Sequence, residues 1–222
     1  MRHKIDIKGR ISQNDDRDVL DYWGIEYTTP SDVRKVIDGV QDGDDVDVYI
    51  NSGGGEIFSG SEIYTTIREL DQRANVNIKI TGLAASAASI IAMAAHSEIS
   101  PTAQLMVHCV STIAAGNHND MERAAEELQE ADRALCRAYM DKTGMTEEDA
   151  LALMEAETWL SAARAVELGL VDAIMFEETK TEPLQMVAAV DPIDIAELRA
   201  KMDQCRQRDR QRKLDLLSLT HR

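Results

Sequence analysis

The fold of this chain is decided by the stretch VDVYINSGGGEIFSGSEIYTTIREL, residues 46–70. Apolar and polar side chains alternate over residues 46–50, as they do in a half-buried strand. Three consecutive glycines follow at 53–55, and apolar residues then recur at helical spacing as far as Leu70. The stretch therefore predicts a strand that passes through a loop of bare backbone into a helix.

The same alternation of strand and helix extends over most of the chain. Apolar stripes with helical spacing separate the strand patterns, and the longest stripe covers residues 121–139. The most apolar segment, residues 83–95, is too short and too rich in alanine and serine to span a bilayer, so we expect a buried helix there. Further strands are predicted over residues 5–9, 76–80, 103–107 and 170–174. We predict an α/β fold with parallel sheet character.

Composition and charge narrow the class of protein. The chain has 222 residues and a formal net charge of -16, which argues against general nucleic-acid binding because such binding requires a basic surface. Its cysteines, at 109, 136 and 205, are odd in number and lack CxxC spacing, so neither a disulfide framework nor a zinc site is predicted. The first residues contain no apolar signal-peptide core. We expect a cytoplasmic protein without a metal, a cofactor or a membrane segment.

The character of the sequence changes near Glu177. Residues 177–182 are polar, Pro183 interrupts, and residues 193–217 have the pattern of a charged helix that carries a basic run at 206–213. We predict one globular domain over residues 1–176 and a C-terminal helical appendage over residues 177–222.

Ser86 is the first candidate for chemistry. It lies in the segment GLAASAAS, residues 82–89, where a strand is expected to end at Gly82 and a helix to begin near Ser86. A hydroxyl at that position lies beside free backbone N–H groups, as a nucleophile next to an oxyanion hole requires. The alternative is that Ser86 simply caps the helix, a common role for serine. Ser89 lies one turn further on, where a hydroxyl more often bonds a carbonyl.

Three consecutive glycines at 53–55 cost conformational entropy, so the chain must require backbone without side chains at these positions. Close approach of a substrate, with a peptide N–H presented to an oxyanion, is one explanation, and a tight turn is the other. No GK[ST] sequence follows the glycines, so a phosphate-binding loop is not predicted.

His108 is the candidate base because it directly follows the predicted strand 103–107 and is held at its end. Its neighbour Cys109 points to the opposite side of an extended chain, which argues against a Cys–His pair. A third group must orient the imidazole, and Glu155 and Glu157 are the candidates unless both are surface charges. The chain order serine, histidine, acid is acceptable because triads are defined by geometry.

Four segments in this order resemble the Clp protease proteolytic subunit (ClpP) family. The resemblance runs from Ile5 to about Met175 and is weaker before Val46. VYINSGGG at 48–55 is similar to the family's INSPGG stretch, and GLAAS at 82–86 to its nucleophile segment GxAAS. The matching histidine strand and closing segment are MVH at 106–108 and LSA with ELGLVD at 160–172.

The resemblance implies a role for each matched residue. Ser86 would be the nucleophile, His108 the general base, and the backbone N–H groups of Gly55 and Ala87 the oxyanion hole. Glu157 falls where the family has its catalytic aspartate, which is a departure. A second departure is Gly53, which replaces the family's proline.

The family's architecture is also implied. Its fold is a ClpP/crotonase-like ββα superhelical spiral, and its members form homo-oligomers of two stacked rings around a chamber that takes peptide or protein substrates. The long helix at 121–139 would match the ring-to-ring handle. An AAA+ unfoldase is the family's regulatory partner, but no segment here identifies its docking site. The insertion around residues 22–24 and the charged tail favour the phage and prophage head-maturation branch.

Two other functions remain open. A crotonase-like acyl-CoA enzyme would use a similar glycine-rich oxyanion site without pairing Ser86 and His108. A degenerate assembly protein would keep the ring and lack hydrolysis, as the Glu157 departure and the basic tail suggest. A Ser–Lys enzyme is not favoured, because no lysine lies near the nucleophile segment.

Overall fold

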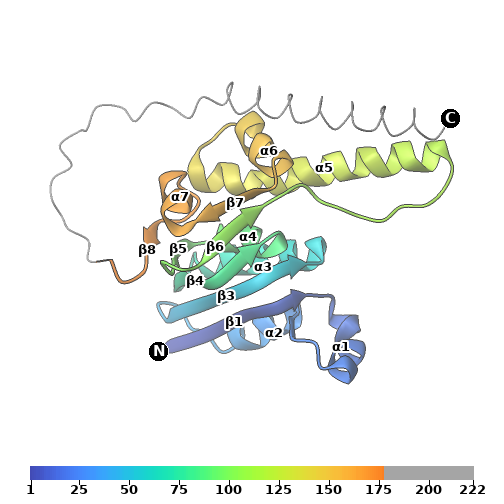
Figure 1. Cartoon of the computed structure of the whole chain (residues 1–222). Coiled ribbons are helices and arrows are strands. Elements are labelled where there is room, and N and C mark those ends of the chain that lie inside the picture. The colour runs from blue at the N-terminus through green and yellow to red at the C-terminus, as the bar shows by residue number, and fades with distance from the viewer. Residues whose placement is uncertain (178–222) are drawn as a thin grey trace, which may run out of the picture. The chain divides into compact units, whose positions relative to one another are not determined.

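A computed structural model describes residues 1–177, and Met1–Glu177 forms one compact unit (Figure 1). The helix expected over residues 193–217 lies outside the described residues. Strands and helices alternate along the described part as follows: β1 (Arg2–Ile11), a 3-10 turn (Asn14–Asp16), α1 (Arg17–Trp23), β2 (Tyr27–Thr28), α2 (Pro30–Ile37), β3 (Asp45–Gly55), α3 (Ile57–Leu70), β4 (Asn75–Ala85), α4 (Ala87–Ala92), β5 (His96–Ile99), β6 (Gln104–Val107), α5 (His118–Thr143), α6 (Glu147–Glu155), β7 (Thr158–Ser161), α7 (Ala162–Glu167) and β8 (Ala173–Ile174).

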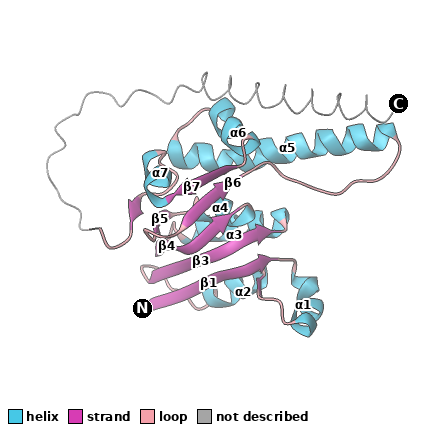
Figure 2. Ribbon diagram, in the orientation of Figure 1, coloured by secondary structure: helices cyan, strands magenta, loops and turns pink. Residues whose placement is uncertain are grey.

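The strands form one sheet, and the predicted parallel character is confirmed. Its main path runs β2-β1-β3-β4-β5-β8, and every pair on that path is parallel. Strand β6 pairs with β4 in parallel, and β7 pairs with β6 in the antiparallel direction (Figure 2). The helices that connect parallel strands bury the sheet, as such crossovers require.

The core follows from the stretch at 46–70. Val46, Val48 and Ile50 alternate along β3 and are fully buried, so the strand contributes a continuous apolar row. Helix α3 buries Ile63 and Ile67 one turn apart. These rows belong to one hydrophobic cluster that also includes the whole of α4 apart from Ser89.

Strand β4 is divided between two neighbours. Its residues 77–80 pair with β5, whereas Leu83, Ala84 and Ala85 pair with β6. The Ser86 N–H continues the contact with β6 by donating to the Met106 carbonyl at 3.1 Å. The division places the end of β4 beside the end of β6.

The helix predicted over residues 83–95 is shorter than expected. Residues 83–85 belong to β4, the helix covers only Ala87–Ala92, and His96 begins β5. Leucine and alanine favour helix only weakly, so pairing with β6 decides the conformation of residues 83–85. The last predicted strand is likewise reduced to Ala173–Ile174. None of the helices in residues 1–177 is long and apolar enough to cross a membrane.

One ionic cluster joins three helix and strand ends. Asp172 forms an ion pair with Lys142 and accepts a hydrogen bond from the Ser97 N–H at 2.8 Å. Lys142 Nζ also donates to the Ala95 carbonyl, and His96 Nδ1 lies 3.3 Å from the Asp172 carboxylate. Partial burial alone would raise the pKa of Asp172, but the bonds from Lys142 and Ser97 outweigh it and lower that pKa.

We expect Asp172→Asn to lower the free energy of unfolding at pH 7 by about 1–2 kcal/mol, since it leaves the largely buried Lys142 without its anion. A carboxylate whose pKa is lower in the folded than in the unfolded protein stabilises the fold at a pH above its unfolded-state pKa, which is about 3.9 for aspartate. That stabilisation is lost as the pH falls through the folded-state pKa. The difference between variant and wild type should therefore shrink below about pH 4. Urea unfolding across pH measures this effect, with Glu69→Gln on the exposed surface of α3 as the control. A difference that grows on acidification would contradict the assignment.

Candidate active site

Ser86 occupies a strained turn between β4 and α4. Its φ of 55° and ψ of -128° lie in a region that non-glycine residues rarely adopt, at a cost of about 1–3 kcal/mol. Its side chain forms no capping hydrogen bond, although the residue stands at the N-cap of α4. The explanation of Ser86 as an ordinary helix cap is therefore wrong. Its hydroxyl remains available to the adjacent pocket.

Two of the three glycines are required by the protein's own backbone. A Cβ at Gly54, where φ is 89°, would lie 2.6 Å from both the Ala85 carbonyl oxygen and the Ser86 Cβ. A Cβ at Gly55 would lie 2.1 Å from the Ile11 carbonyl oxygen. Gly53 has nothing within 4 Å of its Cβ position. The glycines thus allow β3 to approach β1 and the Ser86 turn, an internal reason that the sequence does not reveal.

Backbone donors surround the Ser86 turn. Ala87 is the first residue of α4, so its N–H has no acceptor within the helix and lies at the positive end of the helix. Gly55 lines the same pocket as Ala87 and Ser86. The two predicted oxyanion residues are thus brought together beside the predicted nucleophile.

His108 follows the last residue of β6 and lines the same pocket as Ser86. The chain after it is anchored twice: the Cys109 N–H donates to the Met154 carbonyl at 3.2 Å, and the Val110 N–H donates to Asp132 at 2.6 Å. Burial, with the charge of Asp132, raises the pKa of the Cys109 thiol to about 12. That thiol stays protonated at neutral pH, in agreement with the exclusion of a Cys–His pair.

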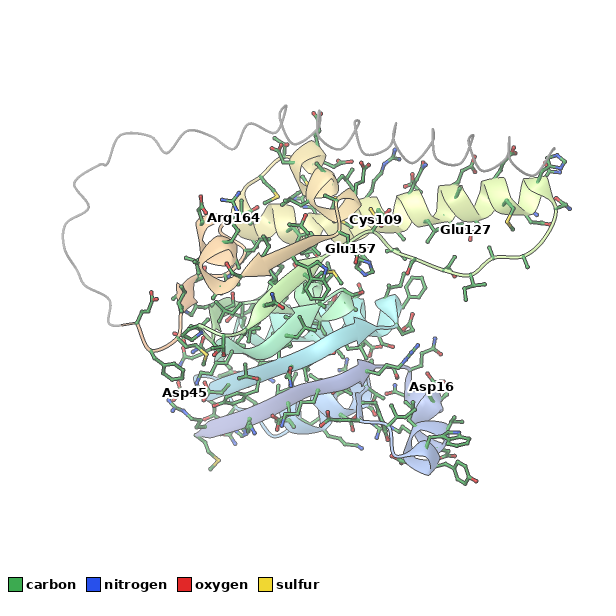
Figure 3. The ribbon with its side chains drawn as sticks, in the orientation of Figure 1. Asp16, Asp45, Cys109, Glu127, Glu157 and Arg164 are labelled. Carbon is green, nitrogen blue, oxygen red and sulfur yellow. The ribbon has the colours of Figure 1, made fainter. Side chains whose placement is uncertain are left out.

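Glu157 approaches His108 through strand pairing. Strands β6 and β7 are antiparallel, and their last pair joins Val107 to Thr158. The next residues along the two chains are His108 and Glu157, which lie just outside the two strands. Figure 3 labels Glu157, which precedes β7, and Cys109 in the loop after β6. The carboxylate is exposed and forms no hydrogen bond or ion pair with residues 1–177, whereas Glu155 lies at the end of α6.

Backbone strain coincides with the predicted triad. Within residues 1–177, the non-glycine residues with positive φ are Ser86, Glu157 and Phe176. Glutamate and serine adopt this region rarely, and such residues concentrate at functional sites. Two of the three outliers therefore stand at positions that the sequence suggests for catalysis. Ser86 and His108 themselves are not hydrogen-bonded to each other in the described structure, a common situation when no substrate is bound.

The pocket has an apolar wall that the sequence patterns did not assign to the site. The cavity measures about 50 Å³, enough for a small group such as a carbonyl but not for a peptide. An extended substrate would therefore lie across its mouth. The apolar positions within residues 46–70 and 83–95 and the apolar stripe of α5 are the signals of this wall in the sequence. The residues of the apolar wall come from four helices and the loop after β6: Ile57, Ile90, Val110, Leu135, Tyr139 and Met154. No group of three or more potential metal ligands occurs in residues 1–177.

A solved structure shares the fold of this chain. A ClpP1 variant from Listeria monocytogenes superposes with a TM-score of 0.63 at 23% identity, covering 79% of this chain and 92% of that one. The described part is thus an α/β chain with the ClpP fold, which confirms the predicted fold class.

Sequence comparison identifies the family. A family model described as Clp protease matches residues 34–178, and the chain belongs to this family of proteases. The ATP-dependent Clp protease proteolytic subunit 2 of Gluconobacter oxydans is 31% identical over 180 residues, which cover 79% of this chain and 80% of that protein. The ATP-dependent Clp protease proteolytic subunit of Bacteroides fragilis is 30% identical over 145 residues, 64% of this chain and 69% of the relative.

The glycine contacts predict different outcomes for neighbouring substitutions. Gly54→Ala should lower the free energy of unfolding by about 2 kcal/mol or more, because the new methyl group meets fixed backbone at a positive φ. Gly53→Ala should change it by less than about 0.5 kcal/mol, since its Cβ position is open. Guanidinium unfolding of both variants measures the difference. Equal effects would show that the close approach of β3 to the Ser86 turn is wrong.

Proposed function

We propose that this protein is a serine endopeptidase in which Ser86 is the nucleophile, His108 the general base and Glu157 the orienting acid. The backbone N–H groups of Gly55 and Ala87 form the oxyanion hole. One observation carries the proposal: Ser86 is held in a strained turn with its hydroxyl uncommitted, facing the pocket that His108 also lines. Membership of the Clp protease family supports the reaction class.

The reaction follows from these positions. Ser86 Oγ attacks the carbonyl carbon of the scissile peptide while His108 removes its proton. The carbonyl oxygen becomes negative and accepts hydrogen bonds from Gly55 and Ala87. When the C–N bond breaks, His108 gives its proton to the leaving amine. A water molecule, deprotonated by His108, then hydrolyses the acyl-enzyme and restores Ser86.

Glu157 is preferred over Glu155 as the acid because of strand register. The β6–β7 pairing ends at Val107 and Thr158, the neighbours of His108 and Glu157, whereas Glu155 belongs to α6. A glutamate is one methylene longer than the family's aspartate, and Glu157 carries a strained backbone with a φ of 48°.

The working form in this proposal is a homo-oligomeric ring, or two stacked rings, that encloses the sites and admits peptide or protein substrates. Helix α5 supports this, since most side chains in its first half are exposed and it extends beyond the sheet (Figure 1). Residues 1–176 would be the peptidase domain and residues 177–222 an appendage. The names of the relatives include ATP dependence, which makes an AAA+ unfoldase a partner to test. We propose the cytoplasm as the location and no cofactor for the reaction.

A fluorophosphonate probe should label Ser86 in the assembled protein, because activated serines react with it selectively. Ser86→Ala should abolish labelling and reduce peptide hydrolysis by up to about a millionfold. Ser111→Ala provides the control, since Ser111 lines the same pocket and its loss should leave labelling intact. Size-exclusion chromatography separates assembled protein from single chains before mass spectrometry locates the label.

Absence of the label from the assembled form would contradict the peptidase and favour an assembly protein that has lost hydrolysis. Specific binding of acyl-CoA thioesters with activity unchanged in Ser86→Ala would instead favour a crotonase-like enzyme.

Replacing the two glutamates separately should identify the acid. Glu157→Gln should reduce kcat/KM by about a hundredfold or more, because glutamine cannot stabilise the imidazolium that forms during attack. Glu155→Gln should remain within about twofold of the wild type. Steady-state hydrolysis of a fluorogenic peptide amide measures both, and thermal melting checks that each variant is folded. The reverse pattern would assign the acid to Glu155, and two unaffected variants would exclude both residues.

A further inference from the structure

A buried pair of hydroxyl groups links α5 to the backbone of the candidate nucleophile. Ser89 is fully buried on α4, and Tyr139 is only 3% exposed on α5. The Tyr139 hydroxyl lies 2.7 Å from Ser89 Oγ, and Ser89 Oγ lies 2.6 Å from the Ser86 carbonyl oxygen. The three groups form a continuous chain from a remote helix to the strained turn.

The direction of the protons in this chain is determined. A carbonyl oxygen only accepts, so the Ser89 hydroxyl must use its single proton to donate to Ser86. The Tyr139 hydroxyl must therefore donate to Ser89. Burial raises the pKa of Tyr139 well above its usual value, despite the opposing effect of the Ser89 bond, so the phenol keeps its proton. The chain runs from Tyr139 O–H through Ser89 O–H to the Ser86 carbonyl.

The Ser86 carbonyl belongs to the same rigid peptide as the Ala87 N–H. A trans peptide is planar, and its C=O and N–H point in opposite directions. Any interaction that holds the Ser86 carbonyl toward α4 therefore holds the Ala87 N–H away from the helix, where Ala87 lines the pocket. Hydrogen bonding at the carbonyl also polarises the peptide and strengthens its N–H as a donor.

This peptide needs support because its conformation is strained. The Ser89 N–H donates to the Ser86 carbonyl at 2.9 Å, and the Ile90 N–H makes a longer bond to the same oxygen at 3.4 Å. The Gly54 backbone packs against the other side of the turn. The two hydroxyls add the only side-chain contribution to this carbonyl within residues 1–177.

We propose that Tyr139, acting through Ser89, is a positioning residue that aims the Ala87 N–H at the oxyanion of the reaction. The inference rests on the proposed peptidase function and deepens it. The Tyr139 hydroxyl is hydrogen-bonded neither to the Ser86 side chain nor to His108. Tyr139 also lines the pocket, but its hydroxyl is connected to the Ser86–Ala87 peptide through Ser89. Tyr139 stabilises the tetrahedral state, in which the oxygen is charged, more than the bound peptide.

The test compares Ser89→Ala and Tyr139→Phe with wild type. Loss of one oxyanion donor typically reduces kcat by about 100-fold or more, so a misaimed donor should reduce kcat less. We expect kcat to fall about tenfold or more in Ser89→Ala and about three- to tenfold in Tyr139→Phe, with KM nearly unchanged. Because the hydroxyls act in series, adding Tyr139→Phe to Ser89→Ala should bring no further loss. Tyr27→Phe is the control, since it removes a phenol that bonds Asp21 at 2.9 Å, away from the pocket.

Inhibitor binding separates positioning from general structural damage. A peptide aldehyde forms a hemiacetal with Ser86 Oγ and presents the hemiacetal oxygen to the oxyanion hole, whereas the matching peptide alcohol forms no such adduct. Affinity for the aldehyde should fall by the same factor as kcat/KM in each variant, and affinity for the alcohol should stay within about twofold. The Tyr139→Phe variant decides the matter if Ser89→Ala does not fold.

The outcomes distinguish this inference from the function on which it rests. A wild-type protein whose Ser86 is not labelled by fluorophosphonate contradicts the peptidase itself. An active, labelled wild type whose variants keep their kcat and aldehyde affinity contradicts only the positioning role. Equal losses for aldehyde and alcohol would likewise overturn it, because they would indicate a damaged pocket rather than a misaimed donor.

Discussion

The hydrogen bond from the Ser86 N–H to the Met106 carbonyl is the contact on which the candidate site depends. It extends the short pairing between β4 and β6 by one residue and fixes the turn that carries Ser86. Strand β6 ends at Val107, one residue after Met106, so the same bond places the turn beside His108. The pairing of β6 with β7 then brings Glu157, the residue before β7, to the same edge of the sheet. Three distant parts of the sequence meet because one strand changes neighbour along its length.

Much of the fold follows from the sequence, since strong periodicity survives in the structure. The apolar alternation in β3 and the helical spacing in α3 reflect burial that is local to each element. The division of β4 does not follow from residues 83–85, because alanine favours helix and tertiary strand pairing overrides that weak preference. Its conformation depends on β6, which lies about twenty residues further along the chain.

The candidate site, like the fold, could be predicted from the sequence only in part. Ser86, His108, Gly55 and Ala87 are recognisable from short motifs, and the structure gathers them around one pocket. Tyr139 and Asp132 have no such motif, because their roles come from contacts that α5 makes with segments far away in sequence. The run of glycines suggests either close approach of a substrate or a tight turn, whereas Gly54 and Gly55 are needed where the protein's own strands converge. Patterns thus indicate which residues are unusual, and packing explains why.

The complete burial of α4 has a consequence for how such a site would be lost over time. All six residues of the helix are buried, and a Cβ at Gly60 would lie only 2.8 Å from the Ala87 Cβ. Selection for a stable interior therefore retains the small residues after Ser86 whether or not the enzyme works. Half-buried His108 and exposed Glu157 carry little of that structural constraint. In a descendant that no longer cleaved peptides, the histidine and the acid would drift first, and the serine segment would persist as a remnant of the fold.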